Sequence, residues 1–164
     1  TYQSLCDHTE AIQIDYDPER ISYAALLEVF WQSHDPGSQP FSRQYMSILF
    51  HHDAKQKQLA EQTSQELAKR SGRTIYTVIR PVATFYRAED YNQKYTLRRH
   101  HDLLGELSAI YPDAADLTDS TAAARINGFL AGEGKADTLK AEVDSYGLSA
   151  QSRDKLLALA ARRL

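Results

Sequence analysis

The sequence lacks the features that mark secreted and membrane-spanning proteins. Its 164 residues contain one cysteine, Cys6, so an intrachain disulfide is excluded. The longest mostly apolar stretch, Ala24–Trp31, is interrupted by Glu28 and is too short to span a bilayer. Residues 1–10 have neither the basic start nor the apolar centre of a signal peptide.

A surplus of basic residues is also missing. Lys and Arg total 19 against 22 for Asp and Glu, which gives a net charge of -3 and no electrostatic footprint for nucleic acid. The composition is typical of globular proteins, with 42% apolar and 25% charged residues. The chain is long enough to bury a hydrophobic core. We therefore expect a soluble, cytoplasmic protein with no nucleic-acid or membrane partner.

Strand and helix signals alternate over the first part of the chain. Ser22 and Asp53 occupy N-cap positions ahead of helical spacing, and Gly72 is placed to end the second helix. Period-two alternation and β-branched or aromatic residues predict the strands. In order, we expect strand 11–16, helix 23–34, strand 46–50, helix 54–70, strand 75–79, strand 84–86 and helix 88–98.

The composition changes after Tyr111 and Pro112. Strand signals end, alanine and leucine increase, and glycines separate three helical segments near residues 120–130, 136–146 and 150–164. The fold class predicted is α+β, with a mixed α+β body over residues 1–111 and an all-helical region over residues 112–164.

Histidine is not arranged to bind a metal. His51-His52 and His100-His101 are adjacent pairs, and neighbouring side chains on a strand or helix point in different directions. His8 and Glu10 form the His-X-Glu half of a zinc deaminase signature, but the Cys-X-X-Cys half is missing. We expect no metal site and interpret the paired histidines as surface or capping residues.

Two other groups of side chains leave alternatives open. Glu10 precedes Ala11 and Ile12, where a carboxyl group shielded from water would keep its proton and act as a general acid, although local sequence alone favours an exposed glutamate. Tyrosine is abundant, with ten residues. Tyr86, Tyr91 and Tyr95 fit either aromatic packing of a helix or the lining of a polar pocket, and their spacing does not choose between them.

Five segments match, in order, the sequence blocks of one known family. They are residues 1–11, 16–18, 21–36, 44–47 and 88–95. Together they resemble the peptide methionine sulfoxide reductase A family, which reduces the S epimer of methionine sulfoxide. The resemblance covers about residues 1–96 and implies the ferredoxin-like core of that family, a small mixed sheet flanked by helices, here incomplete.

The resemblance implies roles for three residues. Glu10 matches the family's buried carboxylic acid, which protonates the sulfoxide oxygen. Tyr2 and Tyr45 match two tyrosines whose hydroxyl groups hydrogen-bond that oxygen. Charge that develops on the oxygen is stabilised by donors in a dry site, and one neutral acid with two phenols supplies them without a competing negative charge.

The sequence also departs from the family pattern. The Gly-Cys-Phe-Trp motif that carries the nucleophile is absent, and so are a C-terminal resolving cysteine and the acidic residue that commonly precedes Tyr45. Asp7 disfavours a thiolate at Cys6. We therefore expect the nucleophilic cysteine upstream of Thr1 and no activity from these 164 residues alone. The alternative is a non-catalytic scaffold or binding protein of the same fold. The helices after Tyr111 resemble an extension found in some family members.

The resemblance also implies the partners. The substrate is methionine-S-sulfoxide, free or in proteins, and the reductant is thioredoxin or a small thiol, so no bound cofactor is expected. The biological role is protein repair in the response to oxidative stress.

Overall fold

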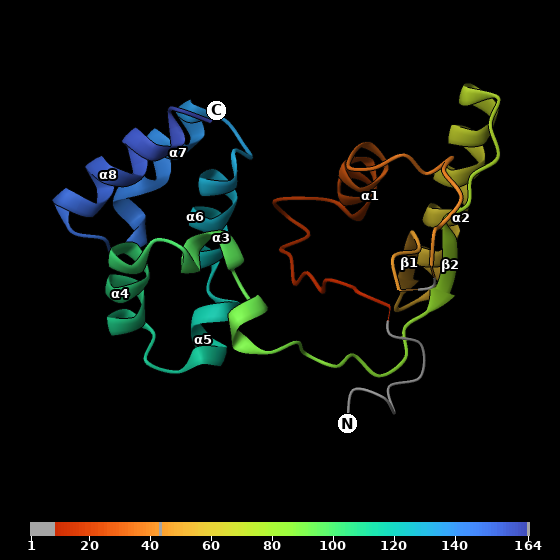
Figure 1. Ribbon diagram of the computed structural model, residues 1–164. Coiled ribbons are helices and arrows are strands. Elements are labelled where there is room, and N and C mark those ends of the chain that lie inside the picture. The colour runs from red at the N-terminus through yellow and green to blue at the C-terminus, as the bar shows by residue number, and fades with distance from the viewer. Residues whose placement is uncertain (1–8, 43, 164) are drawn as a thin grey trace. The chain divides into compact units, whose positions relative to one another are not determined.

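The computed structural model describes residues 9–42 and 44–163. The chain divides into two compact units, unit 1 up to Phe85 and unit 2 from Tyr86 onward (Figure 1). Helices dominate both, and a small parallel sheet lies in unit 1. The predicted α+β fold class is confirmed.

Unit 1 is built around one strand–helix–strand arrangement. Strand β1 (Ile48–His51) pairs in parallel with β2 (Val78–Pro81), with Ile48 opposite Val78. Parallel strands need a long crossover connection, and helix α2 (Ala54–Ser71) provides it and contacts both strands. Helix α1 (Tyr23–Gln32) precedes them and contacts α2.

Local capping accounts for the helix ends in unit 1. The side chain of Ser22 accepts a hydrogen bond from the Ala25 N–H, and that of Asp53 accepts one from the Gln56 N–H. Gly72 ends α2 with φ of 66°, a left-handed conformation that glycine adopts without steric cost. The predicted N-caps and the predicted end of α2 are therefore confirmed.

Side-chain hydrogen bonds attach α1 to the rest of unit 1. The Trp31 indole N–H donates to Thr63 Oγ1 of α2 at 3.0 Å. His34 follows α1, and its Nε2 lies 2.8 Å from Ser47 Oγ, which in turn lies 2.8 Å from Thr77 Oγ1. The end of α1 is therefore linked to the segments that lead into both strands.

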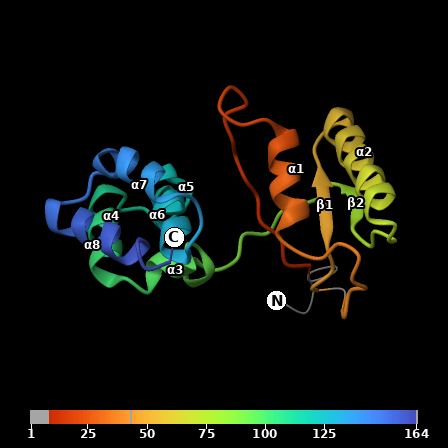
Figure 2. The same ribbon diagram turned by 90° about the horizontal axis from the view of Figure 1, so that it is seen from above.

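Unit 2 is helical throughout its regular structure. Its helices are α3 (Tyr95–Arg98), α4 (His101–Ile110), α5 (Ala114–Asp119), α6 (Thr121–Ala131), α7 (Ala136–Glu142) and α8 (Ala150–Ala160), with short 3₁₀ helices at Asp90–Asn92 (η2) and Val143–Tyr146 (η3) (Figure 2). They enclose a hydrophobic core of Leu97, Leu103, Leu107, Leu117, Ala123, Ile126, Phe129, Leu130, Leu139, Val143, Tyr146, Leu148, Leu156 and Ala160. Three of these helices, α6, α7 and α8, lie where the sequence predicts them.

A half-buried charge network lies beside this core. Arg125 donates to both carboxylate oxygens of Glu142, each at 2.8 Å, and the Tyr146 hydroxyl donates to the same carboxylate at 2.7 Å. Burial and the bond to Glu142 raise the pKa of Tyr146 to about 12. The network links α6 to the end of α7 and to η3.

Four predicted elements differ from the structure. The strand predicted over residues 75–79 is shifted, because β2 is Val78–Pro81. Residues 11–16 and 84–86 are not strands, and the helix predicted over 88–98 is split into η2 and α3. Extended backbone becomes a strand only where a neighbouring strand exchanges hydrogen bonds with it, and the described sheet contains β1 and β2 alone. The split has a local cause, because Gln93 is extended and Lys94 has φ of 50°.

The compact units do not divide where the composition changes. Leu97, Leu103 and Leu107 share the core of the C-terminal helices, and the Asn127 side chain of α6 accepts hydrogen bonds from the Thr96 and Leu97 N–H groups. Packing therefore places α3 and α4 in unit 2. The division into family-like body (1–111) and extension (112–164) stays a prediction.

Candidate functional site

Two of the three predicted site residues, Glu10 and Tyr45, lie in the described chain. Tyr2 lies outside the described residues, as does Cys6. Glu10 contacts Gln44, the residue before Tyr45, through two hydrogen bonds. The Glu10 N–H donates to the Gln44 carbonyl oxygen at 3.2 Å, and Gln44 Nε2 donates to Glu10 Oε1 at 2.8 Å.

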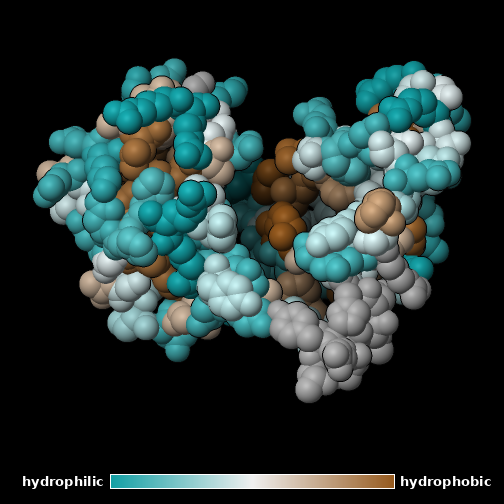
Figure 3. All heavy atoms as spheres, viewed as in Figure 1, coloured by the Kyte–Doolittle hydropathy of each residue, from teal (hydrophilic) through white to brown (hydrophobic). Residues whose placement is uncertain are grey.

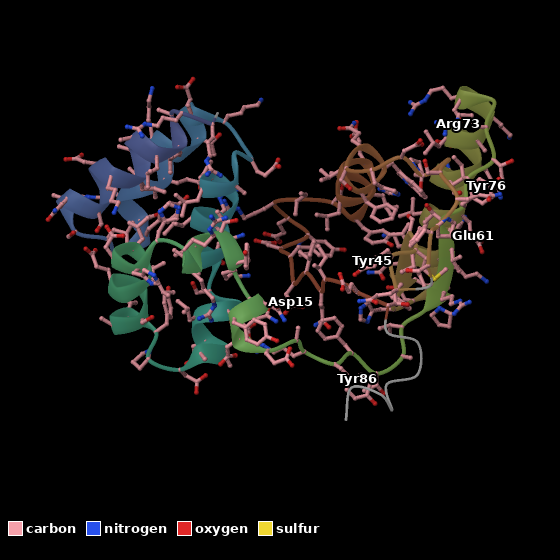
Figure 4. The ribbon with its side chains drawn as sticks, viewed as in Figure 1. Asp15, Tyr45, Glu61, Arg73, Tyr76 and Tyr86 are labelled. Atoms are coloured by element: carbon pink, nitrogen blue, oxygen red, sulfur yellow. The ribbon has the colours of Figure 1, made fainter. Side chains whose placement is uncertain are left out.

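Both described site residues are exposed. Tyr45 is 64% exposed and lies close to β1 (Figure 4). Glu10 is also exposed, which differs from the buried setting that the family resemblance implies. The physical reason is that the described residues of unit 1 bury little, with Leu27 and Ala60 as their buried hydrophobic side chains. The catalytic roles of Glu10 and Tyr45 stay predictions.

Exposed hydrophobic side chains lie close in sequence to Glu10 and Tyr45. Ile12 is 84% and Phe41 99% exposed, and Ile14 is more than half exposed. Figure 3 shows hydrophobic surface over the segment that leads to α1. Apolar side chains grouped at a surface favour binding of another apolar group.

The segment that carries Gln44 and Tyr45 is held at its far end by Ser47. Ser47 accepts a main-chain hydrogen bond from the Val78 N–H at 3.0 Å and contacts His34 and Thr77 through its hydroxyl. His34 Nδ1 lies 2.8 Å from the Phe30 carbonyl oxygen, which can only accept, so Nδ1 carries a proton. The residue types gave no signal of this network, because its members are distant in sequence.

A second polar contact stabilises the loop after α1. Arg73 donates to both carboxylate oxygens of Asp35, at 3.0 Å each, and Gly37 N–H and Ser38 Oγ also donate to that carboxylate. Hydrogen bonds from Arg73 are the largest cause that lowers the pKa of Asp35 to about 2. Figure 4 shows Arg73 near the end of α2, away from Tyr45, so this pair belongs to the scaffold.

The remaining candidates do not form a site. Within residues 9–42 and 44–163, no group of three or more His, Cys, Asp or Glu side chains is placed to hold a metal ion. His51 ends β1, and His100 is the N-cap residue of α4, where burial lowers its pKa. Among the same residues, no helix is both long and apolar enough to cross a membrane.

The tyrosine cluster at the start of unit 2 faces solvent. Tyr86, Tyr91 and Tyr95 are each more than 60% exposed. The choice between packing against the sheet and lining a polar pocket stays a prediction.

Comparisons with known proteins all match this chain to proteins of one name. The sequence profile described as peptide methionine sulfoxide reductase matches residues 1–120. A Drosophila melanogaster protein named peptide methionine sulfoxide reductase is 41% identical over 155 residues, which cover 93% of this chain and 62% of the relative.

Two further relatives carry similar names. Peptide methionine sulfoxide reductase A5 of rice is 41% identical over 136 residues (79% of this chain, 53% of the relative). The enzyme named MsrA of Methanosarcina mazei is 40% identical over 106 residues (58% of this chain, 50% of the relative). The chain thus spans about half to three fifths of the length of these relatives.

Proposed function

Because the chain belongs to the peptide methionine sulfoxide reductase family, we propose that it forms the oxygen-binding part of an enzyme that reduces methionine-S-sulfoxide. The substrate is the free amino acid or the oxidised residue in a protein. The observation that supports the proposal is the contact between Glu10 and Gln44, because Gln44 is the residue before Tyr45 in the chain.

The reaction transfers one oxygen atom from the substrate to a thiol. A cysteine thiolate attacks the sulfoxide sulfur while Glu10 donates a proton to the oxygen, so that a bond forms between the two sulfur atoms. The hydroxyl group then moves from the substrate sulfur to the cysteine sulfur. The bond between the two sulfur atoms breaks, and its electron pair stays on the substrate sulfur. The substrate sulfur is reduced by two electrons to the thioether, and the cysteine sulfur is oxidised by two electrons to sulfenic acid. Two external thiols, or the dithiol of thioredoxin, then reduce the sulfenic acid to thiol and release water.

Glu10, Tyr2 and Tyr45 stabilise the oxygen as its charge develops. The carboxylic acid of Glu10 supplies the proton, and the two phenol hydroxyl groups donate hydrogen bonds. The attacking thiol comes from residues that precede Thr1. The 164 residues by themselves therefore give no turnover, and no bound cofactor takes part.

Replacement of the acid tests the proposal. In the natural protein that includes the residues before Thr1, Glu10→Gln slows the single-turnover reduction of methionine sulfoxide by about 100-fold or more and changes substrate binding little. Glu66→Gln is the matched control, because Glu66 also accepts a hydrogen bond of 2.8 Å from a glutamine, Gln62, on the exposed face of α2. An unchanged rate for Glu10→Gln would refute the role.

The same assay separates the enzyme from the alternative scaffold. Binding of methionine sulfoxide by the natural protein with no reduction in the presence of dithiothreitol would indicate a non-catalytic binding protein. Rapid turnover by the 164 residues alone would contradict an upstream nucleophile and direct attention to Cys6.

A further inference from the structure

We propose that Gln44 is a positioning residue that selects which oxygen of Glu10 carries the catalytic proton. The inference rests on the proposed function, in which Glu10 is the proton donor. It adds a residue that does not touch the substrate and acts through the acid.

The contact between the two residues has a main-chain part and a side-chain part. The Glu10 N–H donates to the Gln44 carbonyl oxygen at 3.2 Å, which sets the distance between the two backbones. Gln44 Nε2 donates to Glu10 Oε1 at 2.8 Å, which sets the orientation of the carboxyl group. Replacement of the Gln44 side chain removes the second bond and leaves the first in place.

The direction of the side-chain bond determines the position of the proton. A protonated carboxyl group has one carbonyl oxygen, which accepts, and one hydroxyl group, which donates. The amide N–H of Gln44 donates to Oε1, and this bond favours Oε1 as the carbonyl oxygen of the protonated acid, because a carbonyl oxygen accepts more strongly than a carboxyl hydroxyl group. The proton therefore resides on Oε2, and Oε2 is the oxygen that delivers it to the substrate.

Gln44 can hold this orientation because its own segment is held. The Ser47 N-terminal to β1 is hydrogen-bonded to the segment before β2, and its hydroxyl contacts His34 and Thr77. Gln44 is also the neighbour of Tyr45 in the chain. One short segment therefore sets the orientation of the acid and the position of a phenol donor.

A double-mutant cycle in the natural protein tests the inference. We expect Gln44→Ala to slow single-turnover reduction of methionine sulfoxide by about tenfold, with little change in substrate binding. In the Glu10→Gln background the same substitution has no further effect, because the proton that Gln44 orients is gone. Gln62→Ala removes a Gln–Glu hydrogen bond of the same length on α2 and leaves the rate unchanged.

Results that differ from these expectations separate the positioning role of Gln44 from the proposed function. A slow Glu10→Gln with a normal Gln44→Ala overturns the positioning role and leaves the proposed function intact. Equal losses from Gln44→Ala in both backgrounds show that Gln44 acts independently of Glu10, which also overturns it. A normal rate for Glu10→Gln overturns both proposals together. Gln44→Met, which keeps the side-chain length without the N–H donor, replaces Gln44→Ala in the cycle if the latter does not fold.

Discussion

Glu10 and Tyr45 are separated by more than thirty residues, and Glu10 contacts Gln44, the residue before Tyr45, through one main-chain and one side-chain hydrogen bond. The amide of Gln44 contacts the Glu10 carboxyl group, and its main chain continues directly into Tyr45. A glutamine at position 44 does not by itself indicate a site, so the sequence alone did not identify Gln44 as part of it. At this scale, the chemistry depends on individual hydroxyl and amide groups.

Removal of the Tyr45 hydroxyl group tests its role as an oxygen donor. We expect Tyr45→Phe in the natural protein to lower kcat/KM for methionine sulfoxide by about 100-fold, since one donor to the developing charge is lost. Tyr45 is 64% exposed, so the free energy of unfolding changes by less than about 0.5 kcal/mol. Tyr86→Phe is the matched control, because Tyr86 is 66% exposed; an equal loss of activity there would contradict a specific role for Tyr45.

At the scale of elements, unit 1 is held together by polar contacts between helix ends and strand entries. His34 and Ser47 join the end of α1 to β1, and Asp35 and Arg73 join the loop after α1 to the end of α2. The described part of unit 1 buries few apolar side chains. These contacts therefore matter more for its geometry than they would beside a large core.

The Asp35–Arg73 pair makes a pH-dependent contribution to stability. The folded-state pKa of Asp35 is lowered to about 2, below its unfolded value of about 3.9. The contribution is therefore fully present above about pH 4 and is lost as the pH falls through 2. We expect Asp35→Asn to lower stability at pH 7, and denaturant titrations should show this difference shrinking between pH 4 and pH 2. A difference that stays constant to pH 2 would contradict the ion pair.

Predictions at the scale of elements succeeded where the signal was local. The helices α1 and α2 begin at the predicted N-caps, because a cap depends on residues three positions apart. The prediction of a strand over residues 11–16 was wrong. The alternation of apolar and polar residues shows that one face could be buried, but it does not show that a partner strand is present. The helices α4 and α5 were missed, since Leu103, Leu107 and Leu117 become recognisable as core only when the helices pack.

On the scale of the whole molecule, the two units differ in how they bury apolar side chains. Unit 2 has a continuous core drawn from its six α-helices, whereas large hydrophobic side chains of unit 1, such as Ile12 and Phe41, are exposed. Conformational stability in a single domain comes mainly from such burial. Unit 2 should therefore fold as an independent cooperative unit.

Core truncation in unit 2 tests this independence. Ile126 is fully buried, so Ile126→Ala should lower the free energy of unfolding of unit 2 by about 2–5 kcal/mol. Ile110→Ala, at a site that is 45% exposed, should cost much less. Amide hydrogen exchange reports the result, with faster exchange in α6 and α8 and unchanged exchange in α2. Equal acceleration in α2 would mean that the units do not unfold separately.

By itself the sequence determined the family, the α+β class and the positions of most long helices. Each of these depends on the order of residues or on contacts between residues a few positions apart, and both can be derived from the sequence. The tertiary structure alone decided the parallel pairing of β1 with β2, the unit boundary at Phe85 and the contact of Gln44 with Glu10. These features depend on which distant segments meet, and that choice is made by packing and hydrogen bonding over the whole chain.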